Sequence, residues 1–318
     1  MAERVALADI RERTYKDRDA WWTVWLVDPL ASRLVRLVSP WRAVTPNRLT
    51  ITAFLVGVAA AACFWQQTWG WLVAGAALFH LSFVLDCMDG KIARLNGSGS
   101  VFGSWLDYVF DRLRVLVCTI ALMGGQFERT GEFVYVWLGG LVIFLDMFRY
   151  LNALQMTAVK NDMRSRLAAA RGETEPIYLE DGEDKGDGRA VVDMYGDFRG
   201  RFGAFSTLRN RLFGRRIRAH LFSGIEFQMF VFIVGPATSL IIPATLVAAA
   251  LLVGFELLLI YKLWSATRTF ARHLAEATAP GSGPESGPES GPESGPESGP
   301  ESGPGPRITA LEPSSPLP

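Results

Sequence analysis

The sequence predicts an all-α fold: an integral membrane bundle of six transmembrane helices, preceded by an N-terminal amphipathic helix at the membrane interface. Three observations lead to this prediction. Apolar residues make up 49% of the 318 residues. No Asp, Glu, Lys or Arg occurs between Leu49 and Leu85, and this stretch is long enough for two spans of about 20 residues each. Tryptophan and phenylalanine are frequent, with 10 and 20 copies, as expected for a chain in contact with lipid.

Residues 1–45 are predicted to form a cytoplasmic segment. The first 20 residues are charged throughout and contain no apolar core of a cleavable signal peptide. The following run, WWTVWLVDPLASRLVRLVSPW, places Trp and Leu beside Arg and is interrupted by Pro29. This mixture favours a helix in the lipid headgroup region. A helix that packs on the protein's own cytoplasmic face fits the pattern equally well.

The membrane domain is predicted to cover residues 46–278. Thr45, Pro46 and Asn47 suit the cap and first turn of its first helix. The six predicted spans cover about residues 49–65, 71–86, 103–123, 133–155, 221–239 and 243–264. Cys63, Cys87 and Cys118 all fall in apolar segments, which favours reduced cysteines.

Lys and Arg predict the orientation of the spans. The connection between the third and fourth spans holds only Arg129, and the connection between the fifth and sixth holds no charge. The remaining connections are rich in arginine. The positive-inside rule therefore places both termini, the loop with Lys91 and Arg94, and a long loop of about residues 157–220 in the cytoplasm. We expect a multi-pass protein of a bacterial plasma membrane.

Charge divides the long loop. Seven acids and one Lys lie between Glu173 and Asp187, and seven arginines lie between Arg199 and Arg218. The acidic part is typical of a solvated loop. The basic part is expected to rest on anionic lipid, and a nucleic-acid partner is disfavoured because a span follows at once. Residues 279–318 contain five GPES repeats and are predicted to be a disordered tail.

Four aspartates stand where a membrane protein rarely keeps charge. Asp86 and Asp89 are spaced i,i+3, and Asp107 and Asp111 are spaced i,i+4, so each pair lies on one helix face. Each carboxylate at a helix centre costs about 2.5–3.5 kcal/mol, and four that face each other repel unless a cation lies between them. All-oxygen ligands suit Mg2+ or Mn2+ better than zinc. Two such ions could hold a phosphoryl group during its transfer.

The aspartates belong to a longer pattern, D-x2-D-G-x2-A-R-x8-G-x3-D-x3-D. Its other fixed positions are Gly90, Ala93, Arg94 and Gly103. The pattern resembles the signature of the CDP-alcohol phosphotransferase family, also called the CDP-alcohol phosphatidyltransferase family. Pro46-Asn47 followed by Thr50 also resembles the start of the first span in that family.

The resemblance implies a membrane transferase of phospholipid biosynthesis, in which an acceptor hydroxyl attacks the β-phosphate of a CDP-alcohol and CMP leaves. It implies that Asp86, Asp89 and Asp107 bind metal, whereas Asp111 both helps to hold metal and acts as the base. A homodimer is also implied by the family, although nothing in the residues themselves requires one.

Four further signature residues are expected to form the nucleotide surface. Gly90 and Gly103 leave space for a nucleotide or for a neighbouring backbone, although small residues also serve helix packing. Arg94 could pair with a phosphate or extend its side chain toward the membrane surface. Ala93 completes the group.

The donor and the acceptor stay open at this point. CDP-diacylglycerol is the expected donor, and the alternative is a soluble CDP-alcohol such as CDP-inositol, CDP-choline or CDP-ethanolamine with a lipid acceptor. A divalent-cation transporter is a more distant alternative, because its site needs access from both sides and the outer loops are short and nearly uncharged. Inositol phosphate, glycerol phosphate, serine and a second lipid all satisfy the signature as acceptors.

Other polar residues inside the spans are secondary candidates. Asp146 and Arg149 are spaced i,i+3 and could neutralise each other. His80 is expected to bond within the bundle. Arg149, Arg209 and Arg211 are candidate contacts for an acceptor phosphate. Glu226, Gln228 and Glu256 lie inside the last two spans.

Overall fold

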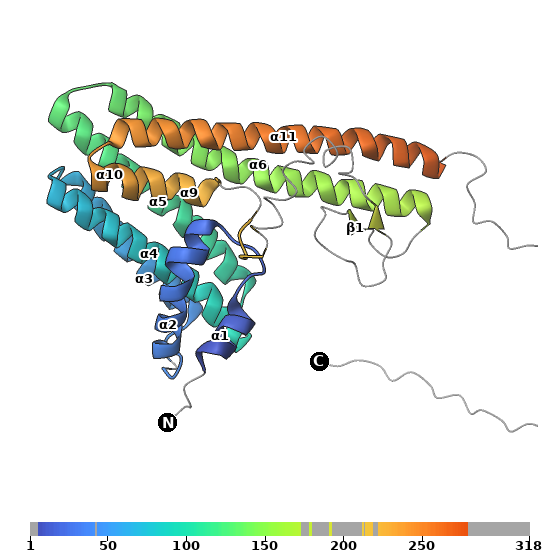
Figure 1. Ribbon diagram of the computed structural model, residues 1–318, viewed down its shortest axis with the longest axis horizontal. Helices are drawn as coiled ribbons and strands as arrows, with labels where there is room; N and C mark the ends of the chain where they lie inside the picture. Colours follow the sequence, from blue (N-terminus) through green and yellow to red (C-terminus); the bar gives the residue numbers. More distant parts are fainter. Residues whose placement is uncertain are drawn as a thin grey trace, which may run out of the picture. The chain divides into compact units, whose positions relative to one another are not determined.

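The computed structural model describes residues 6–41, 43–172, 178–179, 191–192, 212, 214–218 and 222–278. Nearly all of them are helical, which confirms the all-α prediction (Figure 1). The only strands among the described residues are the two-residue parallel pair β1 (Tyr178–Leu179) and β2 (Val191–Val192). The helices are α1 (Leu7–Thr14), η1 (Thr23–Val27), α2 (Asp28–Val38), α3 (Pro46–Trp65), α4 (Trp69–Asn96), α5 (Val101–Thr130), α6 (Val134–Arg171), α9 (Gly224–Met229), η2 (Phe230–Val234), α10 (Gly235–Thr238) and α11 (Ile241–Thr278).

A helix coincides with each of the six predicted spans. Four helices, α3, α4, α6 and α11, are long and apolar enough to cross a membrane. Helix α5 has 30 residues but carries the second pair of aspartates and several arginines, and Gly224–Thr238 is a shorter apolar helix. The coarse prediction of a multi-pass membrane protein is therefore confirmed, and the number of spans stays a prediction.

Helices α4, α5, α6 and α11 run further than the hydropathy pattern predicts. Helix α4 continues past the aspartates to Asn96, where Gly97 adopts a left-handed conformation with φ 61° and ends it. Helix α6 continues to Arg171 and is ended in the same way by Gly172. Hydropathy marks only the apolar part of a helix, whereas a left-handed glycine marks its end.

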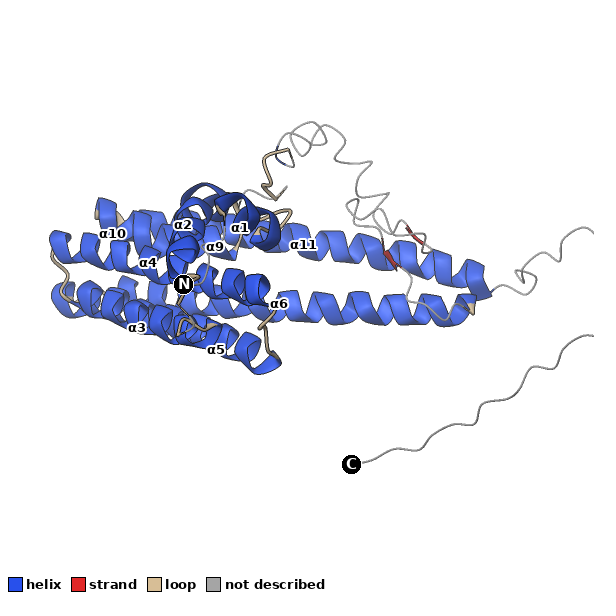
Figure 2. Ribbon diagram, turned by 90° about the horizontal axis from the view of Figure 1, so that it is seen from below, coloured by secondary structure: helices blue, strands red, loops and turns tan. Residues whose placement is uncertain are grey.

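The helices that carry the aspartates pack on α3. Helix α3 contacts both α4 and α5 along its length, and Figure 2 shows these three helices side by side. Phe79 of α4 packs against Phe232 of η2, with ring centroids 4.7 Å apart and the ring planes tilted by 36°. This apolar core lies directly next to Ser82 and Asp86 on α4, so it fixes the helix from which the first carboxylates project.

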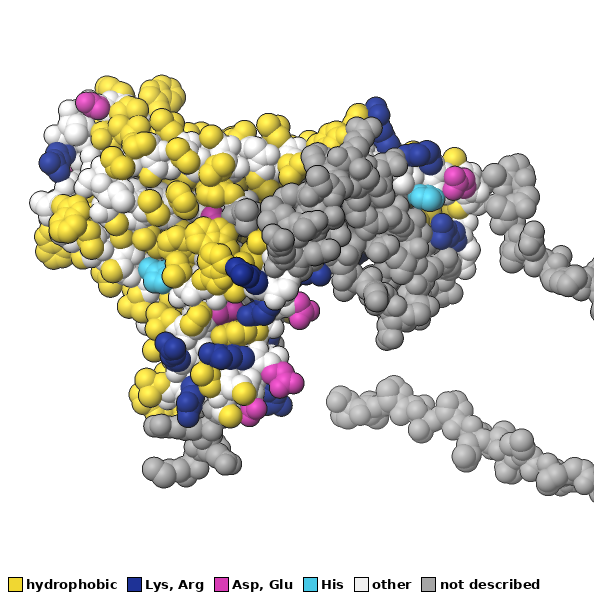
Figure 3. Space-filling view, in the orientation of Figure 1, with side chains coloured by type: hydrophobic (Ala, Val, Ile, Leu, Met, Phe, Trp, Pro, Cys, Tyr) yellow, Lys and Arg dark blue, Asp and Glu magenta, His cyan; other side chains and the backbone are white. Residues whose placement is uncertain are grey.

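The long helices α6 and α11 lie side by side and extend beyond the rest of the bundle (Figures 1 and 2). Their extension has a small core of its own, formed by Met163, Leu167 and Ala266. In Figure 3 hydrophobic side chains cover much of the visible bundle face, and Lys and Arg gather over α1 and α2 and near the end of α11.

The prediction that Pro29 interrupts the N-terminal helix is wrong. Helix α2 follows the π-helical turn η1 without a gap, and Pro29 lies in its first turn, where proline is tolerated. Val27, Ala31 and Val35 are fully buried against the rest of the protein, whereas Trp25 on the other side is 53% exposed. Packing on the protein's own surface is thus observed, and a position at the membrane interface stays a prediction.

Three segments that are distant in the sequence meet beside the C-terminal end of α4. Lys91 Nζ lies 2.7 Å from Asp28 Oδ1, with both side chains at most 5% exposed, and Arg216 lies 3.4 Å from the other oxygen of Asp28. The ring of Tyr15 lies under both cations, 5.1 Å from Lys91 and 4.3 Å from Arg216. We call Tyr15, Asp28, Lys91 and Arg216 the N-terminal clasp. The prediction that Lys91 lies in a loop is wrong, because it is buried within α4.

Candidate metal centre

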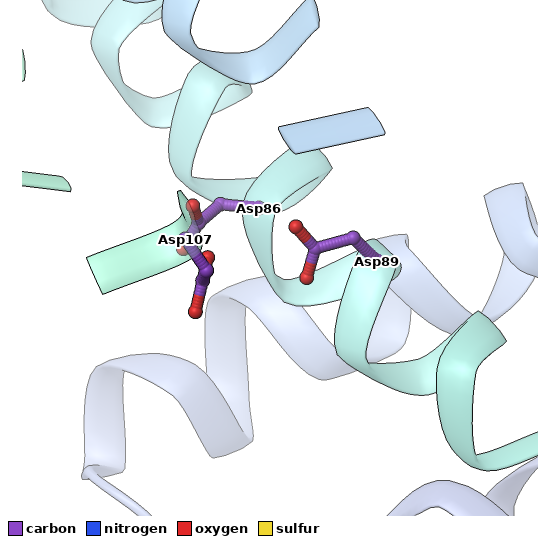
Figure 4. A group of neighbouring side chains, drawn as sticks. All are labelled: Asp86, Asp89 and Asp107. Carbon is purple, nitrogen blue, oxygen red and sulfur yellow. The ribbon is translucent and has the colours of Figure 1, made fainter. Parts of the chain in front are cut away.

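Three of the four signature aspartates meet in space. Asp86 and Asp89 project from α4 and Asp107 projects from α5, and each offers a carboxylate oxygen within 4.8 Å of the others. Figure 4 shows the three carboxylates turned toward one another. The i,i+3 spacing puts Asp86 and Asp89 on one face of α4, and the packing of α4 and α5 on α3 brings Asp107 opposite them. We call these three residues the aspartate triad.

The aspartate triad fits a divalent cation. Its donor set is all oxygen, which suits Mg2+ or Mn2+. Asp107 Oδ1 is buried and has no hydrogen-bond partner in the part of the chain that the structure describes, and a buried acceptor is rarely left in that state. Three carboxylates this close also repel each other unless a cation or a proton is present. These residues would hold the ion.

Thr50 of α3 supports the triad. Its hydroxyl donates a hydrogen bond to Asp89 Oδ2, and both side chains are buried. This bond fixes the orientation of Asp89 and leaves its other oxygen for the triad. The motif that resembles the family at the start of the first span therefore contacts the carboxylates directly.

The other signature residues lie on the same two helices as the triad. A Cβ on Gly103 would lie 2.9 Å from Asn47 Oδ1, so the glycine leaves room for this side chain of α3. Arg94 Nε donates to the carbonyl oxygen of Thr14 at 3.0 Å. A Cβ on Gly90 would meet the guanidinium of Arg94 at 3.5 Å. Ala93 is half-buried on α4.

A cavity of about 680 Å3 lies between the end of α2, the start of α3, the end of α4 and the residue that caps the start of α5. Asn47, Ile92 and Ser100 are among the residues that line it. Because Asn47 also lies against Gly103, the cavity adjoins the signature. This position is compatible with the predicted nucleotide surface.

Asp111, the fourth aspartate, is not part of the triad. Its Oδ1 forms an ion pair with Arg114 Nη2, and its Oδ2 lies 3.7 Å from Arg112 Nη2. Arg114 Nη1 also lies 3.5 Å from Asp86 Oδ1. Arg114 was not among the residues predicted for the site, although an arginine three residues after Asp111 lies on the same helix face.

The prediction that Asp146 and Arg149 neutralise each other is wrong. Asp146 forms an ion pair with Arg112 of α5 and accepts a hydrogen bond from Gln228 Nε2 at 2.9 Å. Arg149 instead pairs with Glu256 of α11, with 3.2 Å between Nε and Oε1. Asp146 and Arg149 thus each pair with a residue of a neighbouring helix and not with each other. These polar contacts connect α6 to the rest of the bundle.

The remaining secondary candidates have separate surroundings. Glu226 forms a capping box with Ser223 at the start of α9. The ring of His80 lies edge-on to Trp22 at 6.2 Å, and its Nδ1 has no hydrogen-bond partner among the described residues. The expected bond within the bundle is therefore not found at that atom. Arg209 and Arg211 lie outside the described residues.

Comparison with known proteins is consistent with the signature. Residues 43–174 match the family model of CDP-alcohol phosphatidyltransferase. The chain is 35% identical over 101 residues to an archaetidylinositol phosphate synthase of Methanothermobacter thermautotrophicus, covering 32% of this chain and 46% of that relative. It is 27% identical over 171 residues to a phosphatidylinositol phosphate synthase of Corynebacterium glutamicum, covering 54% of this chain and 68% of that relative.

A plant relative extends the range of matches. The chain is 32% identical over 93 residues to CDP-diacylglycerol–glycerol-3-phosphate 3-phosphatidyltransferase 2 of Arabidopsis thaliana, covering 29% of this chain and 36% of the relative. The matches span less than half the length of the archaeal and plant relatives. Residues 43–174, which match the family model of CDP-alcohol phosphatidyltransferase, include the helices of the aspartate triad.

Proposed function

We propose that this protein is a membrane enzyme that transfers the phosphatidyl group of CDP-diacylglycerol to a hydroxyl acceptor and releases CMP. The observation that carries the proposal is the aspartate triad: three carboxylates from α4 and α5 within 4.8 Å of one another. Carboxylates inside a membrane are costly and usually functional. One relative is named a phosphatidylinositol phosphate synthase and another a CDP-diacylglycerol–glycerol-3-phosphate phosphatidyltransferase. These names support CDP-diacylglycerol as the donor.

In the proposed mechanism the aspartate triad holds one or two divalent ions. When bound, the metal supplies positive charge that offsets the charge developing on the phosphates. Asp111 accepts the proton of the acceptor hydroxyl as its oxygen attacks the β-phosphate. The bond between that phosphorus and the bridging oxygen breaks, and CMP leaves. Two observations support this role: the Asp111 side chain is 21% exposed, and its Oδ1 is held by an ion pair with Arg114.

The proposed topology has six spans, with the triad opening to the cytoplasm. The helices that coincide with each predicted span support it, as does the arginine content of the inner connections. Residues 1–45 then lie at the inner membrane surface with α2 at the interface, and residues 279–318 form a separate cytoplasmic tail. Cysteine labels at Ser98 should react from the cytoplasmic side, and labels at Thr130 should react from the outside. The opposite pattern would contradict the orientation.

We further propose that the acceptor carries a phosphate, with inositol phosphate as the first candidate. The names of the archaeal and corynebacterial relatives include inositol phosphate. Arg149 is 20% exposed and precedes Tyr150, whose ring stacks on Arg112 at 3.4 Å. Since Arg112 adjoins Asp111, Arg149 is a suitable contact for an anionic group on the acceptor.

Release of CMP by purified protein tests the proposal. CDP-diacylglycerol is incubated with inositol phosphate, glycerol phosphate, serine or inositol, with Mg2+ or with excess chelator. We expect CMP only when divalent metal is present, and fastest with inositol phosphate. Full activity in excess chelator would refute the metal centre. CMP release from CDP-inositol but not from CDP-diacylglycerol would favour the soluble donor instead.

A further inference from the structure

Arg114 is a buried cation beside the aspartates. Its side chain is 2% exposed, and its two terminal nitrogens contact Asp111, Asp86 and Ser82. The Ser82 hydroxyl accepts from Arg114 and itself donates to the carbonyl oxygen of Ala53 at 2.6 Å. The guanidinium is thus held by α4 and α5 together.

The bundle is shaped to admit this arginine. A Cβ on Gly57 of α3 would lie 2.8 and 2.9 Å from Arg114 Cγ and Cδ, closer than real side chains approach. Phe79 and Phe83 lie 5.8 and 6.0 Å from the guanidinium carbon. Gly57 of α3 leaves space for the Arg114 side chain, and Ser82 of α4 accepts a hydrogen bond from its guanidinium. Two neighbouring helices therefore accommodate Arg114, which is not a chance contact at the protein surface.

We propose that Arg114 is a positioning residue that holds Asp111 apart from the aspartate triad and weakens the binding of divalent metal there. The inference rests on the proposed function. In this arrangement Arg114 occupies Oδ1 of Asp111, and Oδ2, which lies 3.7 Å from Arg112 Nη2, is left to accept the proton of the acceptor hydroxyl. Its second contact, with Asp86, places positive charge beside a metal ligand.

Stability alone does not account for Arg114. A buried ion pair costs desolvation and is often replaced by apolar residues without loss of stability, and an arginine inside a membrane is more costly still. A charge beside a metal site, by contrast, has a definite effect. Removing one positive charge near the triad, and releasing the negative charge of Asp111, strengthens the attraction of the site for a cation.

The test is Arg114→Gln, examined by two measurements. The dissociation constant for Mn2+ is measured on purified protein without substrate, by the electron paramagnetic resonance of free Mn2+. We expect it to fall by about tenfold, while turnover in the CMP assay falls by about thirtyfold or more because Asp111 loses its support. A purely structural role predicts the opposite for the metal, since a damaged site binds Mn2+ more weakly.

Two comparisons keep the test informative. Arg166→Gln removes the same charge from a side chain that is 64% exposed and pairs with Asp162, and it should leave both measurements unchanged. Arg114→Lys keeps the charge and should keep the Mn2+ dissociation constant within about twofold of wild type. If Arg114→Gln does not fold, Asp111→Asn with Arg114→Gln keeps a neutral hydrogen-bonding pair, and it should bind Mn2+ more tightly than Asp111→Asn alone.

The outcomes separate the two proposals. Wild-type protein that binds Mn2+ and releases CMP, together with an Arg114→Gln variant whose Mn2+ dissociation constant is unchanged or higher, would overturn the role of Arg114 alone. Wild-type protein that neither binds Mn2+ nor releases CMP would overturn the proposed function, and the role of Arg114 with it.

Discussion

Replacing Thr50 by valine removes one hydroxyl from the support of the metal centre and keeps the shape of the side chain. In the wild type this hydroxyl donates to Asp89 Oδ2, and Thr50 and Asp89 are 3% and 7% exposed. Water therefore has little room to replace the lost donor. Asp89 would keep its charge but lose the bond that orients it toward Asp86 and Asp107.

The expected magnitude follows from the strength of that bond. A hydrogen bond to a charged group contributes about 1.5–3 kcal/mol, and partners of metal ligands typically change metal affinity or activity by about 10–100-fold. We expect the Mg2+ concentration that gives half-maximal CMP release to rise by about 10–100-fold in Thr50→Val. Turnover at saturating Mg2+ should fall much less, because added metal compensates for weaker binding.

Thr52 provides a matched control on the same helix. Its hydroxyl donates to the carbonyl oxygen of Arg48 at 2.8 Å, in an exposed position, so Thr52→Val should leave the Mg2+ requirement unchanged. Thr50→Ser restores a hydroxyl and should recover most of the Mg2+ affinity. The reasoning is refuted if Thr50→Val needs no more Mg2+ than Thr52→Val.

Three further substitutions address other parts of the site. Asp111→Asn should lower turnover about a hundredfold or more while donor binding changes little; a parallel loss of donor binding would make Asp111 chiefly a metal ligand. Gly103→Ala places a Cβ 2.9 Å from Asn47 Oδ1 and should raise the KM for the donor several-fold. An unchanged KM would contradict this prediction. Lys91→Met removes the nearer cation of Asp28 and leaves the more distant Arg216, so it should lower the midpoint of thermal unfolding by about 10 °C. Calorimetry in detergent measures this midpoint, and an unchanged value would contradict the prediction.

Hydropathy and charge spacing predicted the parts of the fold that depend on local sequence. The apolar runs located the helices, and Thr45 with Pro46 located the start of α3 correctly. They did not predict that α4 and α6 continue as charged helices, because the end of a helix depends on its cap at Gly97 or Gly172. Likewise a proline in the first turn of α2 looked like a break in the sequence.

For the candidate site, the spacing of the aspartates along the chain predicted which of them share a helix face. The pairs Asp86 with Asp89 and Asp107 with Asp111 were expected to converge, and three of the four do so. The position of Asp111 depends on its buried partner Arg114, whose own place depends on Gly57 of another helix. Contacts between helices of this kind require knowledge of the packing, which spacing along the chain does not contain.

The N-terminal clasp has a consequence for the time course of biosynthesis. Arg216 lies 188 residues further along the chain than Asp28, whose carboxylate it contacts. At roughly 5–20 residues per second, translation needs about 10–40 s to cover that interval. The carboxylate of Asp28 can meet Lys91, which lies 63 residues further on, before it can meet Arg216. The N-terminal clasp is therefore complete only once the chain has been made as far as Arg216, and the surroundings of the signature helix become final only at that stage.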